Sequence, residues 1–164
     1  MGKIWDDKIK CTSCGELYPE NPIILIILIQ TKGNIIKQIM ELDQITYQII
    51  GAAMKVHNYL GNGFQEVIYQ RCLAIELERA GLHFGREVEQ TIFYEGIEVG
   101  TRRADFVVEN KVIVELKALI NLEDVHLAQA KNYVVAYDFP IGLLINFGAT
   151  SLQYKKIFNK KYNV

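Results

Sequence analysis

One stretch of sequence decides this fold: Arg103-Ala104-Asp105-Phe106-Val107-Val108-Glu109-Asn110-Lys111-Val112-Ile113-Val114-Glu115-Leu116-Lys117. It consists of two apolar runs of the kind that form β-strands, joined by a short polar turn. Asp105 interrupts the first run, and Glu115 and Lys117 interrupt the second. Because unpaired charges are rarely buried in a small domain, something must hold these side chains.

Alternation along the two strands predicts which side chains lie together, since successive residues of a strand point to opposite faces of the sheet. The apolar set expected to pack together beneath helices is Ala104, Phe106, Val108, Val112, Val114 and Leu116. The set expected on the opposite face is Arg103, Asp105, Val107, Ile113, Glu115 and Lys117. The burial pattern alone therefore predicts that Asp105, Glu115 and Lys117 share one surface.

This prediction constrains the turn between the strands. A two-residue loop of Glu109 and Asn110 would pair residue 108 with residue 111 and move Asp105 to the wrong face. We therefore expect a loop with an odd number of residues, or a bulge. A three-residue loop with Asn110 in the left-handed region satisfies the requirement.

The regions around this hairpin predict a fold that contains both helices and strands. Helical periodicity marks residues 42–60, 64–80 and 122–137, and strand patterns mark residues 88–94, 97–108, 111–119, 141–147 and 152–158. The expected order is α-α-β-β-β-α-β-β. The nearly all-apolar run 141–147 predicts a central strand covered on both faces.

Two carboxylates on adjacent strands suit a hard divalent cation, because Mg²⁺ prefers oxygen ligands and keeps several waters. Held by Asp105 and Glu115, with the Leu116 carbonyl as a further ligand, it can polarise a phosphoryl oxygen and activate bound water. Lys117 could orient the attacking water or neutralise charge on the phosphate. The alternative is a solvated Glu/Lys pair on a sheet face, worth at most ~1 kcal/mol.

Five short motifs stand out along residues 42–158: Gly63, Glu66 and Tyr69; Arg103-Ala104-Asp105; Val114-Glu115-Leu116-Lys117-Ala118; His126, Gln129 and Tyr133; and Leu143-Leu144-Ile145-Asn146-Phe147-Gly148. Taken together they resemble the PD-(D/E)XK nuclease superfamily, and within it the family named for its G-x-x-E-x-x-Y motif. Ala104 stands where the superfamily name has Pro. The first 40 residues have no counterpart in the family pattern.

The resemblance implies an α/β fold with a restriction-endonuclease-like core, a mixed central sheet flanked by helices, and the active site on the second and third strands. It implies that Asp105 and Glu115 bind Mg²⁺ or Mn²⁺, that Lys117 is the catalytic lysine, and that Glu66 adds an acidic ligand, directly or through water. Glu66 also has a competing interpretation. If Gly63 is the N-cap, Glu66 takes the third helical position, where free backbone amides favour a carboxylate. Tyr69 fits the core as well as it fits a substrate-binding site.

Gln129 and Tyr133 lie one turn apart on one helix face. They resemble the Q-x-x-x-Y motif that, in some exonuclease branches of the superfamily, orients the lysine and touches the nucleic-acid strand. A half-buried helix with one polar anchor is the alternative. His126 fits a hydrogen-bonded framework residue better than a metal ligand. Arg103 could bind phosphate through paired hydrogen bonds, or pair with an acid such as Glu115.

The composition limits the possible partners. The 164 residues carry a net charge of −1, so nucleic-acid binding must rest on local patches or on metal. The lysines near the C-terminus, either a solvated tail or a weak phosphate-contacting patch, are Lys155, Lys156, Lys160 and Lys161. Cys11 and Cys14 form a C-x-x-C without a second pair, which disfavours zinc, and Cys72 fits a helix core. The odd cysteine count favours a reducing, cytoplasmic setting.

The first 40 residues differ from the rest of the chain. We expect a divergent N-terminal extension, or an upstream stretch that folding does not need, before a nuclease-like domain of residues 41–164. The apolar run 23–29 is too short to span a bilayer and predicts a buried strand or a sticky extension, with no membrane partner.

Two functional hypotheses follow. The first is a Mg²⁺- or Mn²⁺-dependent phosphodiesterase acting on nucleic acid, with DNA ahead of RNA. The second is a nucleic-acid-binding or assembly module that keeps the carboxylate site without efficient cleavage. A toxin-like or defence-associated nuclease that needs a partner is a variant of the first. The sequence leaves both a homodimer and a partner protein open.

Overall fold

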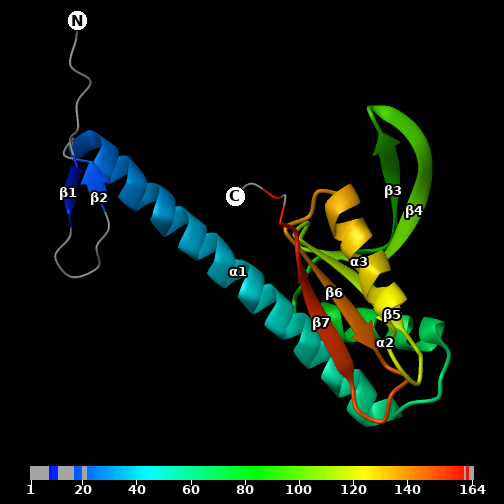
Figure 1. Ribbon diagram of the computed structural model, residues 1–164. Helices are drawn as coiled ribbons and strands as arrows, with labels where there is room; N and C mark the ends of the chain where they lie inside the picture. The colour runs from blue at the N-terminus through cyan, green and yellow to red at the C-terminus, as the bar shows by residue number, and fades with distance from the viewer. Residues whose placement is uncertain (1–7, 11–16, 20–21, 161, 163–164) are drawn as a thin grey trace, which may run out of the picture. The chain divides into compact units, whose positions relative to one another are not determined.

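The computed structural model describes residues 8–10, 17–19, 22–160 and 162, with side chains from Ile29 onward (Figure 1). The chain divides into two compact units, Met1–Glu41 and Leu42–Val164. In the first unit, β1 (Lys8–Lys10) pairs antiparallel with β2 (Leu17–Pro19), and α1 (Pro22–Leu60) begins there and continues into the second unit. None of the described helices is both long enough and apolar enough to cross a membrane. Cys11 and Cys14 lie outside the described residues.

The second unit is built around one five-stranded mixed sheet (Figure 1). After α1 the elements are α2 (Glu66–Arg79), β3 (Phe84–Tyr94), β4 (Ile97–Val108), β5 (Val112–Lys117), α3 (Asp124–Ala136), β6 (Ile141–Asn146) and β7 (Gln153–Phe158). The strands lie in the order β3-β4-β5-β6-β7, and only β5 and β6 are parallel. The expected fold class and the order α-α-β-β-β-α-β-β are confirmed for residues 42–158.

Helices cover both faces of this sheet. The largest core cluster joins residues 45–56 of α1 and the buried face of α2 to alternate residues of β4, β5 and β6. On the other face, Ala130 and Val134 of α3 pack with Leu144 of β6 and Ile157 of β7. All six residues of β6 are buried, which confirms the expected central strand covered on both sides. Cys72 is partly buried against the first cluster, as expected.

Of the two expectations for the apolar run 23–29, the buried strand is wrong, because α1 already begins at Pro22. Proline suits the first position of a helix, because an N–H at that position would have no partner within the helix. No second proline interrupts the 39 residues up to Leu60. The run is therefore part of a long helix, and not a strand.

The β4–β5 hairpin has the odd loop that alternation requires. Val108 pairs with Val112, so the loop consists of Glu109, Asn110 and Lys111. Asn110 has a φ of 52° in the left-handed region, as predicted, and Glu109 has the same φ. The backbone N–H of Lys111 closes the turn on the carbonyl of Val108 at 3.0 Å. Because the loop has three residues, the side chains of β5 point to the faces of the sheet that the sequence predicts.

One part of the alternation prediction is wrong. Phe106, Val108 and the apolar residues of β5 share the first core cluster, but Ala104 packs on the opposite face with Val107 and Ile113. The reversal coincides with Glu87 of β3, whose φ is 50°. The β3–β4 ladder passes from Arg86↔Phe106 to Val88↔Ala104 without pairing Glu87 and Asp105. A left-handed residue inside a strand breaks the two-residue period, so residues beyond this point face the other way.

Candidate active site

Asp105 lies where β4 and β5 separate. The regular β4–β5 pairing ends at Phe106↔Val114. Beyond it, the Oδ2 atom of Asp105 accepts a hydrogen bond of 2.7 Å from the backbone N–H of Leu116. The side chain thus takes the place of a backbone carbonyl and is tied directly to the strand that carries Glu115 and Lys117. Its other oxygen, Oδ1, accepts a hydrogen bond of 3.3 Å from Gln70.

Gln70 is a site residue that the sequence did not reveal. It lies on α2, is only 6% exposed, and donates to Asp105 through Nε2. Its Oε1 accepts a 3.0 Å hydrogen bond from the guanidinium of Arg86 on β3. This relay fixes the Asp105 carboxylate from two elements at once. The only sequence signal was its place directly after Tyr69, which says nothing about a partner thirty-five positions away.

Glu115 is buried in the field of Asp105 and Glu66, and its hydrogen bonds are incomplete. The residue is 6% exposed, and within the described chain its Oε1 atom has no hydrogen-bond partner. Desolvation, then repulsion from Asp105 and Glu66, raises the pKa of Glu115 to about 7, although Lys117 and Arg102 attract its charge. A buried carboxylate with a free oxygen and a raised pKa marks a place that is short of positive charge.

Glu66 joins this group from the start of α2. The helix has Gln65 as its N-cap and Glu66 as its first residue, so the alternative with Gly63 as N-cap and Glu66 at the third position is wrong. The favourable helix dipole remains, because Glu66 still lies in the first turn. Burial raises the pKa of Glu66, opposed by attraction to Lys117 and by a hydrogen bond from the backbone of Ala118.

Lys117 is the cation that these acids share. Its charge opposes the rise in pKa of Glu66, Asp105 and Glu115, and desolvation is the leading cause of that rise for all three acids. The structure therefore brings the four predicted residues into one electrostatic group. One buried and two half-buried carboxyl groups against one lysine leave that group acidic, even with Arg102 in range of Glu115.

The chain just after Lys117 is fixed by β6. The backbone N–H of Phe147 donates to the carbonyl of Lys117 at 2.8 Å. Asn146 holds both backbone groups of Leu119, accepting from its N–H at 2.9 Å and donating to its carbonyl at 2.8 Å. Gly148 passes so close that a Cβ atom would lie 2.4 Å from the nitrogen of Leu119. These contacts explain why Asn146 and Gly148 occur in the motif that ends β6.

The donor set fits a lightly chelated cation. Within the described residues, no three His, Cys, Asp or Glu side chains converge closely enough to enclose a metal ion. Asp105 and Glu115, one of them with an unpartnered buried oxygen, still offer the one or two carboxylates by which Mg²⁺ is usually held while it keeps water. Zinc and calcium sites need more protein ligands, so the residues fit Mg²⁺ or Mn²⁺ better.

Gln129 and Tyr133 of α3 contact Arg102, which connects them to the acidic group. Gln129, with its amide oriented to satisfy the donors around it, accepts from the Tyr133 hydroxyl at 2.8 Å and from Arg102 at 2.9 Å. The Arg102 guanidinium lies 4.2 Å from the centre of the Tyr133 ring. Gln129 and Tyr133 therefore form one cluster with Arg102, whose charge acts on Glu115.

Arg103 was expected on the site face, and the structure places it elsewhere. Its guanidinium lies 4.0 Å from the carboxylate of Glu87 and is largely exposed. Arg102 instead lies over Tyr133 of α3, because the strand reverses its facing between Ala104 and Phe106. The sequence offered two adjacent arginines, and regular alternation selected the wrong one.

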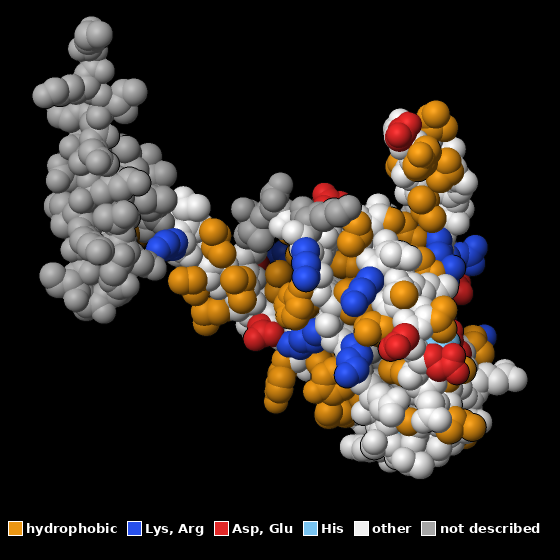
Figure 2. All heavy atoms as spheres, in the orientation of Figure 1, with side chains coloured by type: hydrophobic (Ala, Val, Ile, Leu, Met, Phe, Trp, Pro, Cys, Tyr) orange, Lys and Arg blue, Asp and Glu red, His pale blue; other side chains and the backbone are white. Residues whose placement is uncertain are grey.

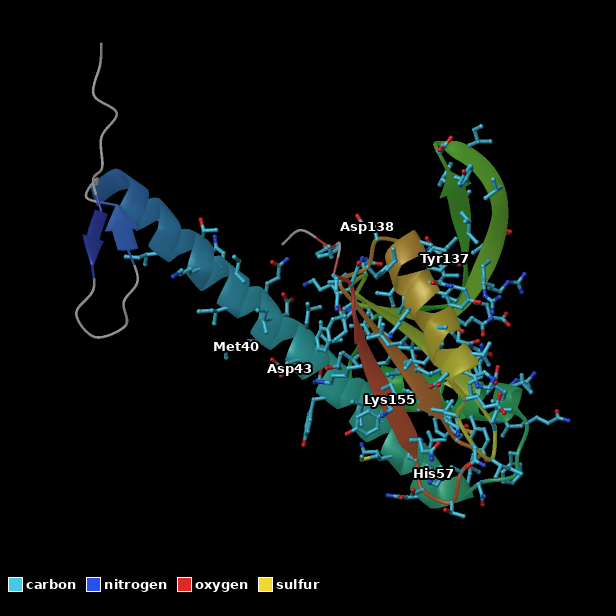
Figure 3. All side chains as sticks on the ribbon, in the orientation of Figure 1. Met40, Asp43, His57, Tyr137, Asp138 and Lys155 are labelled. Atoms are coloured by element: carbon cyan, nitrogen blue, oxygen red, sulfur yellow. The ribbon has the colours of Figure 1, made fainter. Side chains whose placement is uncertain are left out.

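Tyr69 belongs to the framework. It is fully buried, stacks on Phe147 at 4.7 Å, and donates its hydroxyl to the carbonyl of Gly61. His126 accepts from the backbone of Glu123 at the start of α3, which confirms its framework interpretation. His57, near the C-terminal end of α1, bonds the carbonyl of Ala149 (Figure 3).

Comparison with known proteins decides the family. The family model of the PD-(D/E)XK nuclease superfamily matches residues 43–157. The chain belongs to this superfamily. Members of the PD-(D/E)XK superfamily are generally nucleases, and the match covers every residue of the acidic group.

Other comparisons add little. No curated protein matches the chain. Among solved structures, the crystal structure of SSO0001 is similar with a TM-score of 0.48 and 20% identity, covering 57% of this chain and 50% of that one. The similarity spans only half of SSO0001 and carries no functional argument.

Proposed function

We propose that this protein is a metal-dependent nuclease whose active site consists of Asp105, Glu115 and Lys117. The observation that supports this most strongly is the buried carboxylate of Glu115, with one oxygen lacking a partner among the described residues and a pKa raised to about 7. A folded protein keeps such a costly group when a cation completes it. Membership of the PD-(D/E)XK superfamily supplies the reaction class.

The chain's own residues divide the work in this proposal. Asp105 and Glu115 would hold Mg²⁺ or Mn²⁺, with the Leu116 carbonyl as a further ligand and with Glu66 contributing directly or through water. When bound, the cation supplies Lewis-acid stabilisation of the phosphate and a more acidic water. Lys117 lies in the field of all three acids, where it orients the attacking water and neutralises charge on the phosphate.

The α3 cluster contacts the substrate in this proposal. After Lys117, Arg102 is the cation that most opposes the rise in the pKa of Glu115, and Gln129 and Tyr133 fix its position. We assign phosphate binding to Arg102 with support from Gln129 and Tyr133. Arg103 and Tyr69, which the sequence favoured as substrate contacts, receive no support from their positions. DNA as substrate, the G-x-x-E-x-x-Y family and a domain of residues 41–164 belong to the same proposal.

A cleavage screen tests the proposal. The wild type is incubated with single-stranded, double-stranded and branched DNA and with RNA, with and without Mg²⁺ or Mn²⁺. Asp105→Asn, Glu115→Gln and Lys117→Ala are each expected to lose about 10³-fold in rate, the size of effect seen when a transition-state charge partner is removed. Glu98→Gln, an exposed carboxylate on β4, is the matched control and keeps full activity. Cleavage at the wild-type rate by all three variants would sink the proposal.

A binding assay separates the metal site from the chemistry. Mg²⁺ or Mn²⁺ at about ten times its Kd should raise the free energy of unfolding by about 1.4 kcal/mol in the wild type. Glu115→Gln should abolish that stabilisation, and Lys117→Ala should keep it. Equal stabilisation of the wild type and Glu115→Gln would show that the metal binds elsewhere.

The second candidate is a nucleic-acid-binding module without efficient cleavage. The observation in its favour is that no three acidic, histidine or cysteine side chains enclose a metal position among the described residues. It predicts strand binding without turnover on any substrate of the screen. Metal-dependent turnover that Lys117→Ala removes would exclude it.

A further inference from the structure

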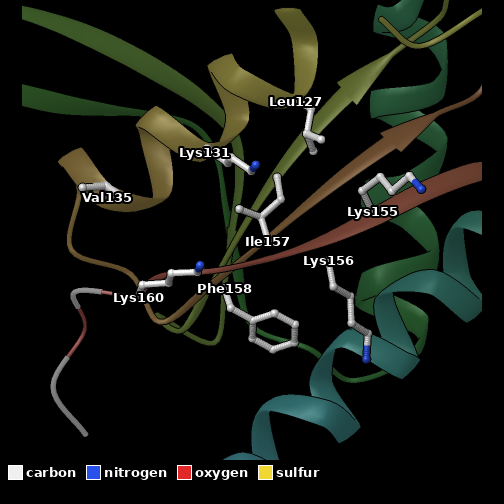
Figure 4. A pocket seen from close by; sticks show the side chains of 8 residues that line it. All are labelled: Leu127, Lys131, Val135, Lys155, Lys156, Ile157, Phe158 and Lys160. Carbon is white, nitrogen blue, oxygen red and sulfur yellow. The ribbon is translucent and has the colours of Figure 1, made fainter. Parts of the chain in front are cut away.

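A groove on the opposite side of α3 from the Arg102 cluster is not used by the proposed chemistry. It has a volume of about 520 Å³ and lies between α3 and β7. Its lining consists of Leu127, Lys131, Val135, Lys155, Lys156, Ile157, Phe158 and Lys160 (Figure 4). Half of these side chains are apolar, half are lysines, and none is acidic. Figure 2 shows lysine and apolar side chains gathered over this part of the molecule.

The apolar part of the groove is unusually open. Phe158 is 67% exposed and Val135 is 40% exposed, although both line a concave surface. Ile157 forms the floor, where it joins the cluster of α3 and β6. A large exposed aromatic side chain beside aliphatic ones marks a surface that gains from being covered.

The lysines around it are available for an anionic partner. Lys156 is committed to Asp43 of α1 at 2.7 Å. Within the described part of the chain, Lys131, Lys155 and Lys160 have no acidic partner. Three such cations around an apolar floor complement a segment that is apolar on one side and acidic on the other.

The backbone geometry specifies the shape of that segment. β7 pairs only with β6 among the described strands, so its outer edge is free. Four consecutive residues, 155–158, line the groove, and consecutive side chains point to both faces of a sheet. The groove therefore follows the free edge of β7, and does not lie over one face.

The free edge presents defined hydrogen-bonding groups. The N–H of Asn159 donates to the carbonyl of Pro140 at 3.0 Å, which places the odd-numbered residues of β7 in hydrogen-bonded pairs with β6. In an antiparallel ladder the alternate residues turn their backbone groups outward. Tyr154, Lys156 and Phe158 thus offer N–H and C=O groups to a further strand.

We propose that the α3–β7 groove binds an extended acidic–apolar segment of a partner protein, which adds a strand to the free edge of β7. Its backbone pairs with Tyr154, Lys156 and Phe158. Because Ile157 packs on α3 and Phe158 points to the other face of the sheet, its apolar side chains lie against Phe158 and its carboxylates face Lys131 and Lys155 on the α3 side (Figure 4). A peptide fits this surface better than a nucleic acid, because a phosphodiester chain cannot satisfy a strand edge. The proposal is independent of the nuclease activity.

A short labelled peptide of alternating Glu and Val tests the surface with the full-length protein. Fluorescence anisotropy should show saturable binding, and hydrogen exchange should slow at the amides of Tyr154, Lys156 and Phe158. Lys131→Glu/Lys155→Glu should weaken binding by at least about tenfold. Lys37→Glu/Arg71→Glu, which makes the same charge change at exposed positions outside the groove lining, should bind as the wild type does.

A backbone-blocked peptide separates strand addition from simple charge attraction. N-methylation of alternate amides on one edge of the peptide should abolish binding, and methylation of the other edge should leave it unchanged. Equal binding by the Lys131→Glu/Lys155→Glu variant and the Lys37→Glu/Arg71→Glu control would overturn the proposal. No difference between the two methylated peptides would overturn it as well. So would binding of a single-stranded oligonucleotide in the groove with no binding of the peptide. Complete absence of peptide binding would show that the lysines only protect the edge from unwanted pairing.

Discussion

The two ends of the β4–β5 hairpin carry the same alternating sequence and do different things. At the turn, Phe106↔Val114 through Val108↔Val112 form a regular ladder of buried residues. At the other end the ladder stops, and the carboxylate of Asp105 takes the N–H of Leu116 that a backbone carbonyl would hold in a longer ladder. The acidic group therefore forms where the β4–β5 ladder ends and a side chain, in place of a backbone carbonyl, accepts the backbone hydrogen bond.

The largest effect is expected from breaking the turn end. Deletion of Asn110 shortens the loop by one residue, so β5 must either turn its core residues away from α2 or lose its pairing with β4. We expect the deletion to prevent folding, as measured by circular dichroism and size-exclusion chromatography. Asn110→Gly, which keeps the loop length and tolerates a φ of 52°, is the control and should fold. A deletion variant that melts at the wild-type temperature would show that the register does not depend on the loop.

At the site end, the relay to Asp105 can be cut without touching the proposed catalytic residues. Gln70→Ala removes the donor to Asp105 and the acceptor for Arg86, and should lower metal affinity or cleavage about 10- to 100-fold. Gln70→Glu keeps an acceptor for Arg86, yet places a second negative charge beside Asp105. It should therefore be no better than Gln70→Ala. Kinetics over a range of metal concentrations measure both effects, and wild-type behaviour of either variant would remove Gln70 from the site.

The buried charge at the site end should lower stability as the pH rises. The folded-state pKa of Glu115 is about 7, above its ordinary value of 4.5, so the folded protein binds this proton more tightly than the unfolded chain does. The stabilisation is present below pH 4.5 and is lost between pH 4.5 and about 7, by up to roughly 3 kcal/mol. Urea titrations across this range, without divalent metal, measure the loss. Glu115→Gln should flatten most of this slope, and an unchanged slope would contradict the origin assigned to it.

The smallest effect is expected at Glu87 of β3, where the regular β3–β4 pairing is interrupted. Glu87 has a φ of 50°, which costs a non-glycine residue about 1 kcal/mol. Its ion pair with Arg103 is exposed and long, so losing it costs little. Glu87→Gly should therefore raise stability by up to about 1 kcal/mol, whereas Glu89→Gly, in the extended part of β3, should lower it by ~0.5–1 kcal/mol. Thermal unfolding of the two variants measures these changes in stability. Equal destabilisation by both would contradict the backbone strain assigned to Glu87.

The order of elements and the hairpin were predictable because both depend on local periodicity. The odd loop followed from requiring that the apolar residues of β4 and β5 face one core. The helical start of α1 was not predictable from an apolar run, since a short run fits a strand and a buried helix equally well. The N-cap of α2 was placed two residues too early, because Gly63 has a φ of 105° and serves the loop before the helix.

The candidate site was predictable in its acids and its lysine, and not in the residues that hold them. Asp105, Glu115 and Lys117 were identified by side-chain alternation, and Glu66 by its motif. Gln70 and Arg102 were missed because their roles depend on contacts across the fold. Gln70 meets Asp105 only when α2 packs on the sheet, and Arg102 faces α3 only because the strands reverse at Glu87 and Asp105.

Residue type and spacing alone determined the order of helices and strands along the chain, the odd hairpin loop and the chemical identity of the acidic group. The tertiary structure was needed to show that Asp105 replaces a backbone acceptor, that Glu115 keeps an unpartnered oxygen in the described chain, and that Arg102 acts on the charge of Glu115 while Arg103 lies beside Glu87. The physical reason is that burial, hydrogen bonding and electrostatic attraction act through space. Residues distant in the chain therefore set the direction and the protonation of these few side chains.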